Sequence, residues 1–348
     1  MNVKLELRRV SGSSAGARNV RRAWNWRCGL LVDLCLDAGH GFGEASPLPG
    51  YSPDTLSQAE AALAALDVRA LERALERPQI LEALKAVAEL LPGTQPAARM
   101  ALETAALDWR ARRDGVSAAA MLGAAPQAER PLAWLAADSG AVHCAQAVGY
   151  RHFKMKVGAP GKLAAELAAV KDLDSALAAG SRLRLDANQS WTEADAQYAC
   201  RELAAMDVEF IEEPCRNLSR PLETDIAIAL DESLCGRHPD ELEGLVRCTG
   251  ARVVILKPML LGGLTHCLEL GGRAAALGLG VVVSHSFDGP VALIAAGALA
   301  LTLPTTFAQG LAPHAGLASW PRVPLPIVAA AFQAWTRPGL GIAREDLG

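Results

Sequence analysis

The stretch that decides the fold runs from residue 153 to residue 258. It holds five short segments built alike: FKMK at 153–156, LDAN at 185–188, FIEEP at 210–214, LDES at 230–233 and ILKP at 255–258. In each segment, charged residues accompany or follow a short apolar run. Along the chain the order is two lysines, then three carboxylate positions, then a third lysine. Because a buried charge is costly unless it has a partner, charges at the ends of buried strands indicate a site.

Around these segments, β-like runs alternate with alanine-rich helical stretches. We expect eight strands, at residues 132–135, 153–157, 183–186, 208–211, 226–230, 253–256, 281–284 and 306–308. We expect helices at residues 162–179, 192–205, 264–277 and 291–301. Alternation of strand and helix implies parallel pairing, and eight repeats imply an α/β barrel of the TIM type rather than an open sheet.

The first part of the chain has a different pattern of apolar residues. Residues 1–50 are expected to form antiparallel strands, with a mobile loop at 11–22 and a hairpin turn at the glycines of 39–43. From residue 55 to about 115 the apolar residues recur at helical spacing, most clearly at 99–113. A domain boundary is therefore expected near residues 116–131.

Composition narrows the class of protein. The apolar fraction of 51% allows a large core, and the 5% of aromatic residues do not suggest a surface for stacking bases. A net charge of -4 without a long basic run argues against nucleic acid or an anionic membrane as a partner. The eight cysteines form no Cys-x-x-Cys pair, and no window resembles a signal peptide or a membrane span. We expect a cytoplasmic protein with reduced thiols.

The strand ends carry the chemistry, because the active site of such a barrel lies at the carboxyl ends of its strands. Asp186, Glu212 and Asp231 would come from three successive strands and form a site rich in hard oxygen ligands. Mg2+ suits such a site, with Mn2+ as the alternative ion, and no cysteine or histidine points to zinc. The metal would polarise a substrate carboxylate and stabilise the enediolate left by removal of its α-proton.

The lysines supply the base that such a reaction needs. Lys154 and Lys156 lie on the same side of their strand because side chains alternate with a period of two. A second ammonium group and a nearby dication lower the pKa of a lysine, so that it can accept a proton. Lys257 arrives from the opposite side of the barrel mouth, which permits either proton return or electrostatic help from that side.

These residues resemble the enolase superfamily in its muconate-lactonising subgroup. The matching segments are Lys154-x-Lys156, Asp186-Ala-Asn188, Glu212-Glu-Pro214, Asp231-Glu-Ser233 and Lys257-Pro, and residues 43–49 and 98–105 are similar to its capping loop and following helix. The resemblance implies a modified TIM barrel, (β/α)7β, at residues 126–320 and an α+β capping domain at residues 1–125. The segment 321–348 would pack back on the capping domain. The resemblance also implies Mg2+ on the three acids, Lys156 as the base and Lys257 as the opposing lysine.

The resemblance further implies a small-molecule carboxylate as substrate. Our leading expectation is o-succinylbenzoate synthase, a lyase that dehydrates 2-succinyl-6-hydroxy-2,4-cyclohexadiene-1-carboxylate in menaquinone biosynthesis. The chain is short for the subgroup, and residues 307–314 lack the Asp-x-Asp pair with which dipeptide epimerases hold an ammonium group. Dipeptide epimerase, N-acylamino acid racemase and muconate cycloisomerase are the alternatives.

Several neighbouring residues have less direct roles. Glu213 and Glu232 are expected to support the ligands beside them, and Asn188 is either a supporting residue or a turn residue. Many synthases carry Glu-Ser-Ser after the seventh strand, whereas this chain has Ser284-His285-Ser286-Phe287-Asp288. Ser284 and Asp288 are therefore candidate substrate contacts, with Asp288 in place of the glutamate. We expect His40 and His314 to serve loops.

Two other classes compete with this interpretation. A Schiff-base aldolase would need one desolvated lysine and no metal, which leaves the three acids unexplained. A non-catalytic binding protein built on the barrel would have no need to keep every catalytic position filled. Trapping of a lysine adduct by borohydride would favour the aldolase. The absence of turnover despite tight Mg2+ binding would favour the binding protein.

Overall fold

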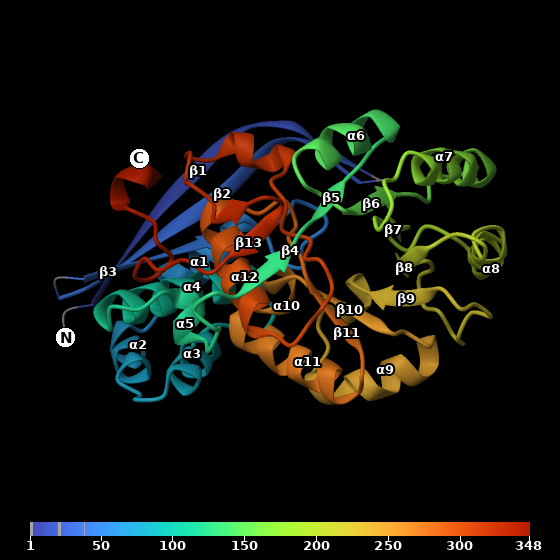
Figure 1. Cartoon of the computed structure of the whole chain (residues 1–348). Coiled ribbons are helices and arrows are strands. Elements are labelled where there is room, and N and C mark those ends of the chain that lie inside the picture. Colours follow the sequence, from blue (N-terminus) through green and yellow to red (C-terminus); the bar gives the residue numbers. More distant parts are fainter. Residues whose placement is uncertain (1–2, 20–21, 38) are drawn as a thin grey trace.

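The computed structural model describes residues 3–19, 22–37 and 39–348. It combines an antiparallel sheet with its own helices and a curved parallel sheet with helices along its outside (Figure 1). The antiparallel sheet has the order β1 (Val3–Arg18), β2 (Ala23–Leu36) and β3 (Gly39–Ala45).

The loop predicted at residues 11–22 is mostly strand, so that prediction is wrong. Residues 11–18 continue β1 and pair with β2, with Ser11 opposite Cys28 and Ala17 opposite Trp24 around an irregularity in the register. Serine and glycine have low strand propensity, but the cross-strand partner supplies the hydrogen bonds and overrides it. Residues 20 and 21 of the predicted loop lie outside the described residues.

The glycines predicted to form a turn lie inside β3, which corrects a second expectation. Helix α4 (Pro96–Arg113) crosses this strand closely. A Cβ atom on Gly41 would lie 2.1 Å from the carbonyl oxygen of Ala105, and one on Gly43 would lie 2.0 Å from that of Ala101. These glycines therefore allow a helix to approach a strand backbone, a role that local sequence does not distinguish from a turn.

Shorter helices complete the first part of the chain. They are α1 (Leu56–Ala64), α2 (Val68–Leu75), α3 (Ile80–Glu89) and α5 (Ala118–Met121). Helix α4, predicted at residues 99–113, begins three residues earlier with Pro96 at its first turn, where a missing backbone N–H costs nothing.

The parallel sheet has seven strands in chain order. They are β5 (Ala133–Leu135), β6 (His152–Lys156), β7 (Arg182–Asp186), β8 (Val208–Glu212), β9 (Ala227–Leu230), β10 (Val253–Leu256) and β11 (Gly280–Val283). The helices after them are α6 (Ser139–Ala147), α7 (Leu163–Ser175), α8 (Glu193–Glu202), α9 (Leu242–Thr249), α10 (Pro258–Leu261), α11 (Leu264–Ala276) and α12 (Pro290–Thr302). Between β8 and β9 the chain turns without a helix.

The barrel closes through two single bridges rather than through the strand predicted at 306–308. Gln309 bridges Leu132 and Gly310 bridges Ser284, both in parallel, which joins the first and seventh strands of the sheet. The nitrogen of Gly310 donates to the carbonyl of Val283 at 2.8 Å. The curved sheet with its separate N-terminal sheet confirms the predicted α/β barrel with a second domain.

The last segment of the chain returns to the earlier part. Strands β12 (Ile327–Val328) and β13 (Ala331–Gln333) extend β4 (Glu129–Pro131), and the 3-10 turn at Arg344–Leu347 lies beside β1. There the guanidinium of Arg8 donates to the carbonyl of Leu347. The domain limits 1–125, 126–320 and 321–348 stay a prediction.

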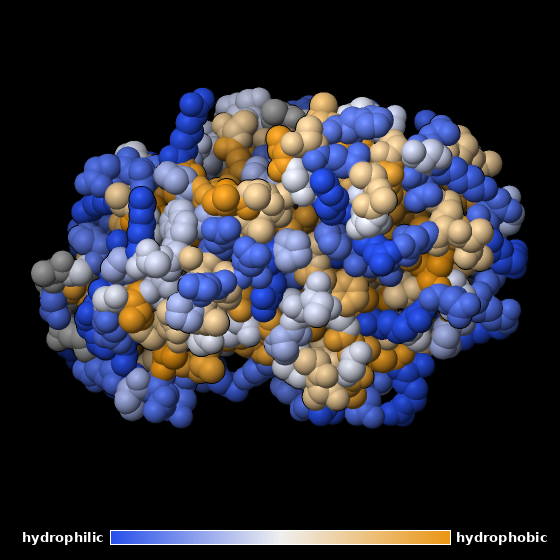
Figure 2. All heavy atoms as spheres, viewed as in Figure 1, coloured by the Kyte–Doolittle hydropathy of each residue, from blue (hydrophilic) through white to orange (hydrophobic). Residues whose placement is uncertain are grey.

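Polar residues cover most of the face shown in Figure 2, and hydrophobic residues lie between them in scattered patches. Among the described residues, no helix is both long and apolar enough to cross a bilayer. The most apolar helix, α12, is buried almost completely, because β3, α4, α5 and β11 all pack against it.

Candidate active site

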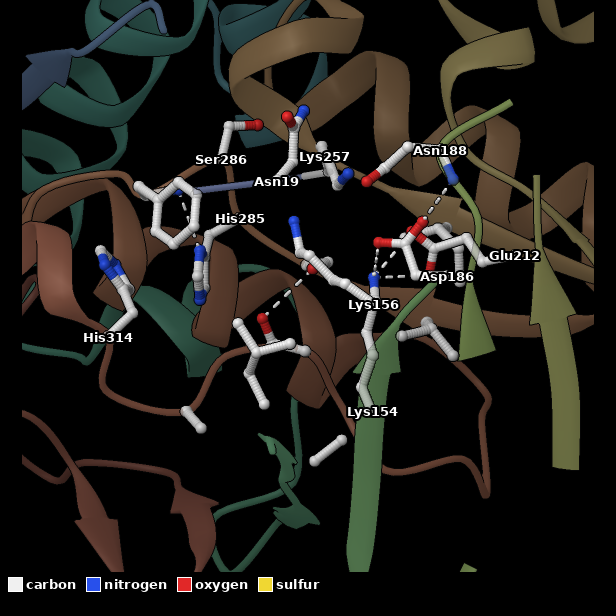
Figure 3. A pocket seen from close by; sticks show the side chains of 18 of the residues that line it. Asn19, Lys154, Lys156, Asp186, Asn188, Glu212, Lys257, His285, Ser286 and His314 are labelled. Carbon is white, nitrogen blue, oxygen red and sulfur yellow. Dashed lines mark hydrogen bonds and ion pairs between the residues drawn. The ribbon is translucent and has the colours of Figure 1, made fainter. Parts of the chain in front are cut away.

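The carboxyl ends of β6 to β10 bring the predicted charged residues into one place (Figure 3). Lys156 is opposite Asp186 in the sheet register, and Asp186 is opposite Glu212. Asp231 follows β9 directly, and Lys257 follows β10. The register of the parallel sheet therefore aligns Lys156, Asp186 and Glu212, and the turns after β9 and β10 add Asp231 and Lys257.

The three acids are almost completely buried, with side chains about 2% exposed. Lys154 Nζ lies 2.9 Å from Asp186 Oδ2 and 2.8 Å from Glu212 Oε2. Burial raises the pKa of Asp186, but the positive charges of Lys154, Lys156 and Lys257 together more than offset this and hold it at about 2. Lys257 forms an ion pair with Asp231.

Lys156 has a different environment from the other two lysines. Its Nζ lies 5.7 Å from the ring centre of Phe287, and no carboxylate of the described residues forms an ion pair with it. Burial lowers its pKa, and the positive charge of Lys154 adds to this. Of the three lysines, Lys156 is therefore the one best suited to be neutral and to accept a proton.

Lys257 is held in its charged form. Burial alone lowers its pKa, but the nearby carboxylates of Asp231, Glu212 and Glu232 more than offset this, so the pKa lies well above the ordinary value. Its Nζ donates to Tyr51 Oη at 3.0 Å and lies 5.5 Å from the centre of that ring. Tyr51 Oη in turn donates to Glu232 Oε1 at 3.1 Å.

Tyr51 was not predicted as a site residue. It belongs to the loop after β3 and reaches Lys257 across 206 positions of sequence. Nothing in the spacing of the sequence connects these two residues, because their contact depends on how the first part of the chain covers the barrel mouth.

The donor set fits Mg2+. Asp186, Glu212 and Asp231 offer hard oxygen atoms, and the carboxyl groups of Glu212 and Asp231 lie within hydrogen-bond reach of each other. Two adjacent buried carboxylates repel, and a divalent cation relieves that repulsion. Buried oxygen atoms of Asn188 and Glu232 nearby have no hydrogen-bond partner among the described residues, which leaves further polar atoms for a hydrated ion.

Glu213 and Asn188 hold the turns that carry the acids. Glu213 Oε1 accepts from the backbone nitrogens of Asp231 and Ser233, each at 2.7 Å. The backbone nitrogen of Asn188 donates to Asp186 Oδ1 at 3.1 Å, and its side chain donates to Glu232 at 3.1 Å. Both Glu213 and Asn188 have positive φ, 42° and 43°, a strained conformation that is common at functional sites.

The wall facing Lys156 comes from residues 284–287 and 314. The rings of His285 and His314 lie against each other, tilted by 34°, with centroids 4.1 Å apart. Burial lowers the pKa of His314 to about 3 and that of His285 well below its ordinary value, so both rings are neutral. Neither ring nitrogen of His314 has a hydrogen-bond partner among the described residues, nor has the hydroxyl of Ser286. His314 thus lines the cavity, which the expectation of a loop role did not anticipate.

Ser284 and Asp288 lie in different places. Ser284 lines the cavity, and its hydroxyl donates to the carbonyl of Gly310 at 3.2 Å. Asp288 is buried behind the loop, where its Oδ1 accepts from the nitrogen of Ser286 at 3.2 Å. It does not line the cavity around the lysines. Its position indicates that it shapes the loop rather than touching a ligand.

Arg184 was not predicted as a site residue, although its position in the sequence contains a signal for such a role. It stands two residues before Asp186 on β7, so the period of two places both on the inner face of the barrel. Its guanidinium forms an ion pair with Glu209 and lies 4.7 Å from the ring centre of Phe210, and its Nη2 has no hydrogen-bond partner among the described residues. Arg184 lines the same cavity as the three lysines, Asp186 and Glu212.

Two family models match this chain. Residues 139–346 match the model described as enolase C-terminal domain-like, and residues 17–87 match the model described as the MenC N-terminal domain. The first model covers most of the barrel, and the second covers the part of the chain that supplies Tyr51.

Curated relatives and solved structures agree with this match. The o-succinylbenzoate synthase of Escherichia coli O6:K15:H31 (strain 536 / UPEC) is 33% identical over 327 residues, covering 87% of this chain and 89% of the relative. That of Pasteurella multocida (strain Pm70) is 30% identical over 325 residues, covering 87% and 88%. The muconate lactonizing enzyme from Pseudomonas fluorescens complexed with muconolactone superposes with a TM-score of 0.86 at 25% identity, covering 99% of this chain and 97% of that one.

Proposed function

Because this chain belongs to the enolase superfamily, we propose that it is an o-succinylbenzoate synthase. The proposed reaction is the Mg2+-dependent dehydration of 2-succinyl-6-hydroxy-2,4-cyclohexadiene-1-carboxylate, a step of menaquinone biosynthesis. It begins with removal of the α-proton from the carboxylate substrate to give an enediolate. The observation that carries the proposal is the similarity to o-succinylbenzoate synthases, which extends over 87% of the chain.

The two lysines would divide the proton chemistry. In the proposed reaction Lys156 Nζ, whose pKa burial lowers, takes the α-proton and later delivers it to the departing hydroxyl, which leaves as water. Lys257 stays protonated beside Asp231 and would hold the negative charge that develops on the substrate. Figure 3 shows both lysines facing the same space from different strands.

Asp186, Glu212 and Asp231 would hold the metal, with Mn2+ as the alternative ion. When bound, Mg2+ supplies charge stabilisation for the carboxylate oxygens of the substrate. Lys154, now between Asp186 and Glu212, would neutralise the charge that three buried acids leave beside a dication. Its positive charge also keeps the pKa of Lys156 low.

The first part of the chain would exclude water from the reaction. Trp24, Leu48 and Tyr51 line the cavity, and Trp24 packs against Phe287 with ring centroids 6.2 Å apart. An apolar cover makes each charge interaction at the strand ends stronger than it would be in water.

The lining argues against a dipeptide as substrate. Segment 307–314 contributes Gly310, Ala312, Pro313 and His314 to the cavity. Among the described residues that line it, the acidic side chains are Asp186 and Glu212, both of them already in the proposed metal set. A substrate ammonium group would find no carboxylate on the wall opposite the metal.

A direct assay tests the proposal. Purified protein with Mg2+ is incubated with 2-succinyl-6-hydroxy-2,4-cyclohexadiene-1-carboxylate, and formation of o-succinylbenzoate is followed against a Lys156→Ala control. We expect turnover with this substrate and none with a panel of dipeptides, N-acylamino acids and cis,cis-muconate. Turnover of a panel member and not of the cyclohexadiene acid would assign the chain a different reaction of the same superfamily.

The assay also separates this reaction from Schiff-base chemistry. Removal of divalent ions with EDTA should abolish turnover, and added Mg2+ should restore it. Full activity in EDTA, together with a lysine adduct trapped by borohydride, would overturn the metal-dependent proposal.

A further inference from the structure

Three potential metal ligands meet on the antiparallel sheet, outside the candidate active site. Asp33 and Cys35 are two residues apart on β2, so their side chains lie on the same face. His40 on β3 is directly opposite Cys35 in the register. The register between these two strands therefore brings a carboxylate, a thiol and an imidazole together.

Their distances resemble those between the ligands of a tetrahedral metal ion. Cys35 Sγ lies 3.4 Å from His40 Nδ1 and 3.5 Å from Asp33 Oδ1, and His40 Nδ1 lies 2.9 Å from Asp33 Oδ1. Tetrahedral zinc with usual bond lengths separates sulfur from nitrogen or oxygen by about 3.6 Å, and nitrogen from oxygen by about 3.4 Å. Only the Asp33–His40 pair, now hydrogen-bonded, would have to open, by roughly half an ångström.

We propose that Asp33, Cys35 and His40 form a second metal site, which takes a borderline-soft divalent cation such as Zn2+. A thiolate and an imidazole favour Zn2+ over Mg2+, which distinguishes this site from the all-carboxylate set at the barrel mouth. Three protein ligands leave the fourth position to water. His40 is 36% exposed and lines an open surface hollow, so this ligand is accessible to solvent.

The surroundings hold the carboxylate in place. Arg344 Nη2 lies 3.3 Å from Asp33 Oδ2 and 3.5 Å from Glu6 Oε2, so the other oxygen of Asp33 is left for the metal. Lys4 pairs with Glu6 at 2.5 Å. Around Cys35 the negative charges of Glu6 and Asp33 balance the positive charges of Lys4 and Arg344. We therefore expect this site to bind the metal more weakly than sites with several thiolates.

Binding requires the thiol proton to leave. Burial, together with Asp33, raises the pKa of Cys35 to about 11, so at neutral pH the metal must displace a proton from sulfur into solvent. The charged and titratable groups around Cys35 are Lys4, Glu6, Asp33, His40 and Arg344. Since the proton is released on binding, the affinity for the metal should rise with pH.

Cobalt titration of the untagged protein tests the site, because a thiolate bound to Co2+ gives a charge-transfer absorption band that carboxylates do not give. We expect the band in the wild-type protein at one equivalent and its loss in Cys35→Ser, with affinity for Co2+ at this site at least tenfold lower. Excess Zn2+ should displace Co2+ and remove the band. His40→Gln should weaken binding as well, and circular dichroism confirms that the variants are folded.

Two controls separate this site from other cysteines and from the proposed function. Cys248→Ser, which changes an exposed cysteine elsewhere, should leave the band intact. Asp186→Asn should also leave it intact, because Asp186 belongs to the other site. A band that survives Cys35→Ser, or no band in the wild-type protein, would refute the inference, whatever the turnover assay shows.

Discussion

Lys156 and Lys257 both lie at strand ends, yet their surroundings shift their pKa values in opposite directions. Lys257 is bound to Asp231 and Tyr51, and its pKa is raised. Lys156 faces the ring of Phe287, and its pKa is lowered. In the proposed reaction these shifts suit Lys156 to act as the base and Lys257 to act as a fixed positive charge at the same cavity.

Substitution of the proposed base gives the first prediction at the residue scale. Lys156→Ala should lower kcat by about 10²- to 10⁴-fold or more, because no other described lysine is poised to accept the proton. Mg2+ affinity, measured by calorimetry, should stay near that of the wild type. The exposed Lys171→Ala serves as control. Substantial residual turnover in Lys156→Ala would remove this residue as the base.

The dependence of rate on pH gives a second prediction. Only neutral Lys156 accepts a proton, and the neutral fraction grows as pH rises, so kcat should increase with pH. Because burial lowers the pKa, the midpoint should lie below the ordinary value of 10.5. Lys257, with its raised pKa, stays protonated over that range. A rate that is flat or falling from about pH 6 to 9 would contradict this assignment.

At the scale of elements, the register of β6, β7 and β8 aligns the charged residues. Lys156, Asp186 and Glu212 are successive partners across three strands. A one-residue slip would turn each inner side chain to the helix-facing side. The strand ends therefore act as one rigid site.

The metal ligands can be tested at this scale. Asp186→Asn removes one charge while it keeps the shape of the strand end, so Mg2+ affinity should fall about tenfold or more. Isothermal titration calorimetry measures the affinity. Asp172→Asn, on the exposed side of α7, should leave it unchanged. Equal affinity in Asp186→Asn and wild type would exclude Asp186 as a ligand.

The contact between β3 and α4 gives a prediction about stability. Gly43→Ala forces a methyl group to within 2.0 Å of a carbonyl oxygen, so it should lower the free energy of unfolding by about 1–3 kcal/mol or more. Gly244 in α9 has open space around it, and Gly244→Ala should instead stabilise by about 0.5–1 kcal/mol. Urea denaturation compares the two. Equal effects of the two substitutions would contradict the close approach of helix and strand.

At the scale of the whole molecule, two buried charged residues join the antiparallel sheet to the barrel. Arg27 donates to the carbonyls of Ser46 at 2.7 Å and Phe287 at 3.1 Å. Glu44 accepts from the nitrogens of Gly289 at 2.6 Å and Val291 at 3.1 Å. Both connections reach the loop that carries Phe287, so the position of the cavity wall depends on the domain contact.

Loss of the Arg27 connection should affect stability and activity together. Arg27→Met leaves buried carbonyl groups without a donor, so it should destabilise the fold by about 2–5 kcal/mol. It should also lower kcat/KM, because the loop with Phe287 loses its anchor. The exposed Arg69→Met should change neither. A stable variant with unchanged kcat/KM would show that this contact does not position the loop.

The sequence by itself determined the barrel, the order of its strands and the set of charged residues at their ends. These follow from local patterns, since a period of two sets the side of a strand and chain order sets its neighbours in a parallel sheet. The sequence also contained a signal for Arg184, because this residue lies two positions before Asp186 on the same strand.

Only the tertiary structure decided the contacts that elements outside the barrel strands make. It extended β1 through residues 11–18, placed glycines of β3 under α4, and brought Tyr51 onto Lys257 and His314 into the cavity wall. It also joined Asp33, Cys35 and His40. The physical reason is that these contacts depend on how separate elements pack, and packing between distant segments leaves no periodic trace in the chain.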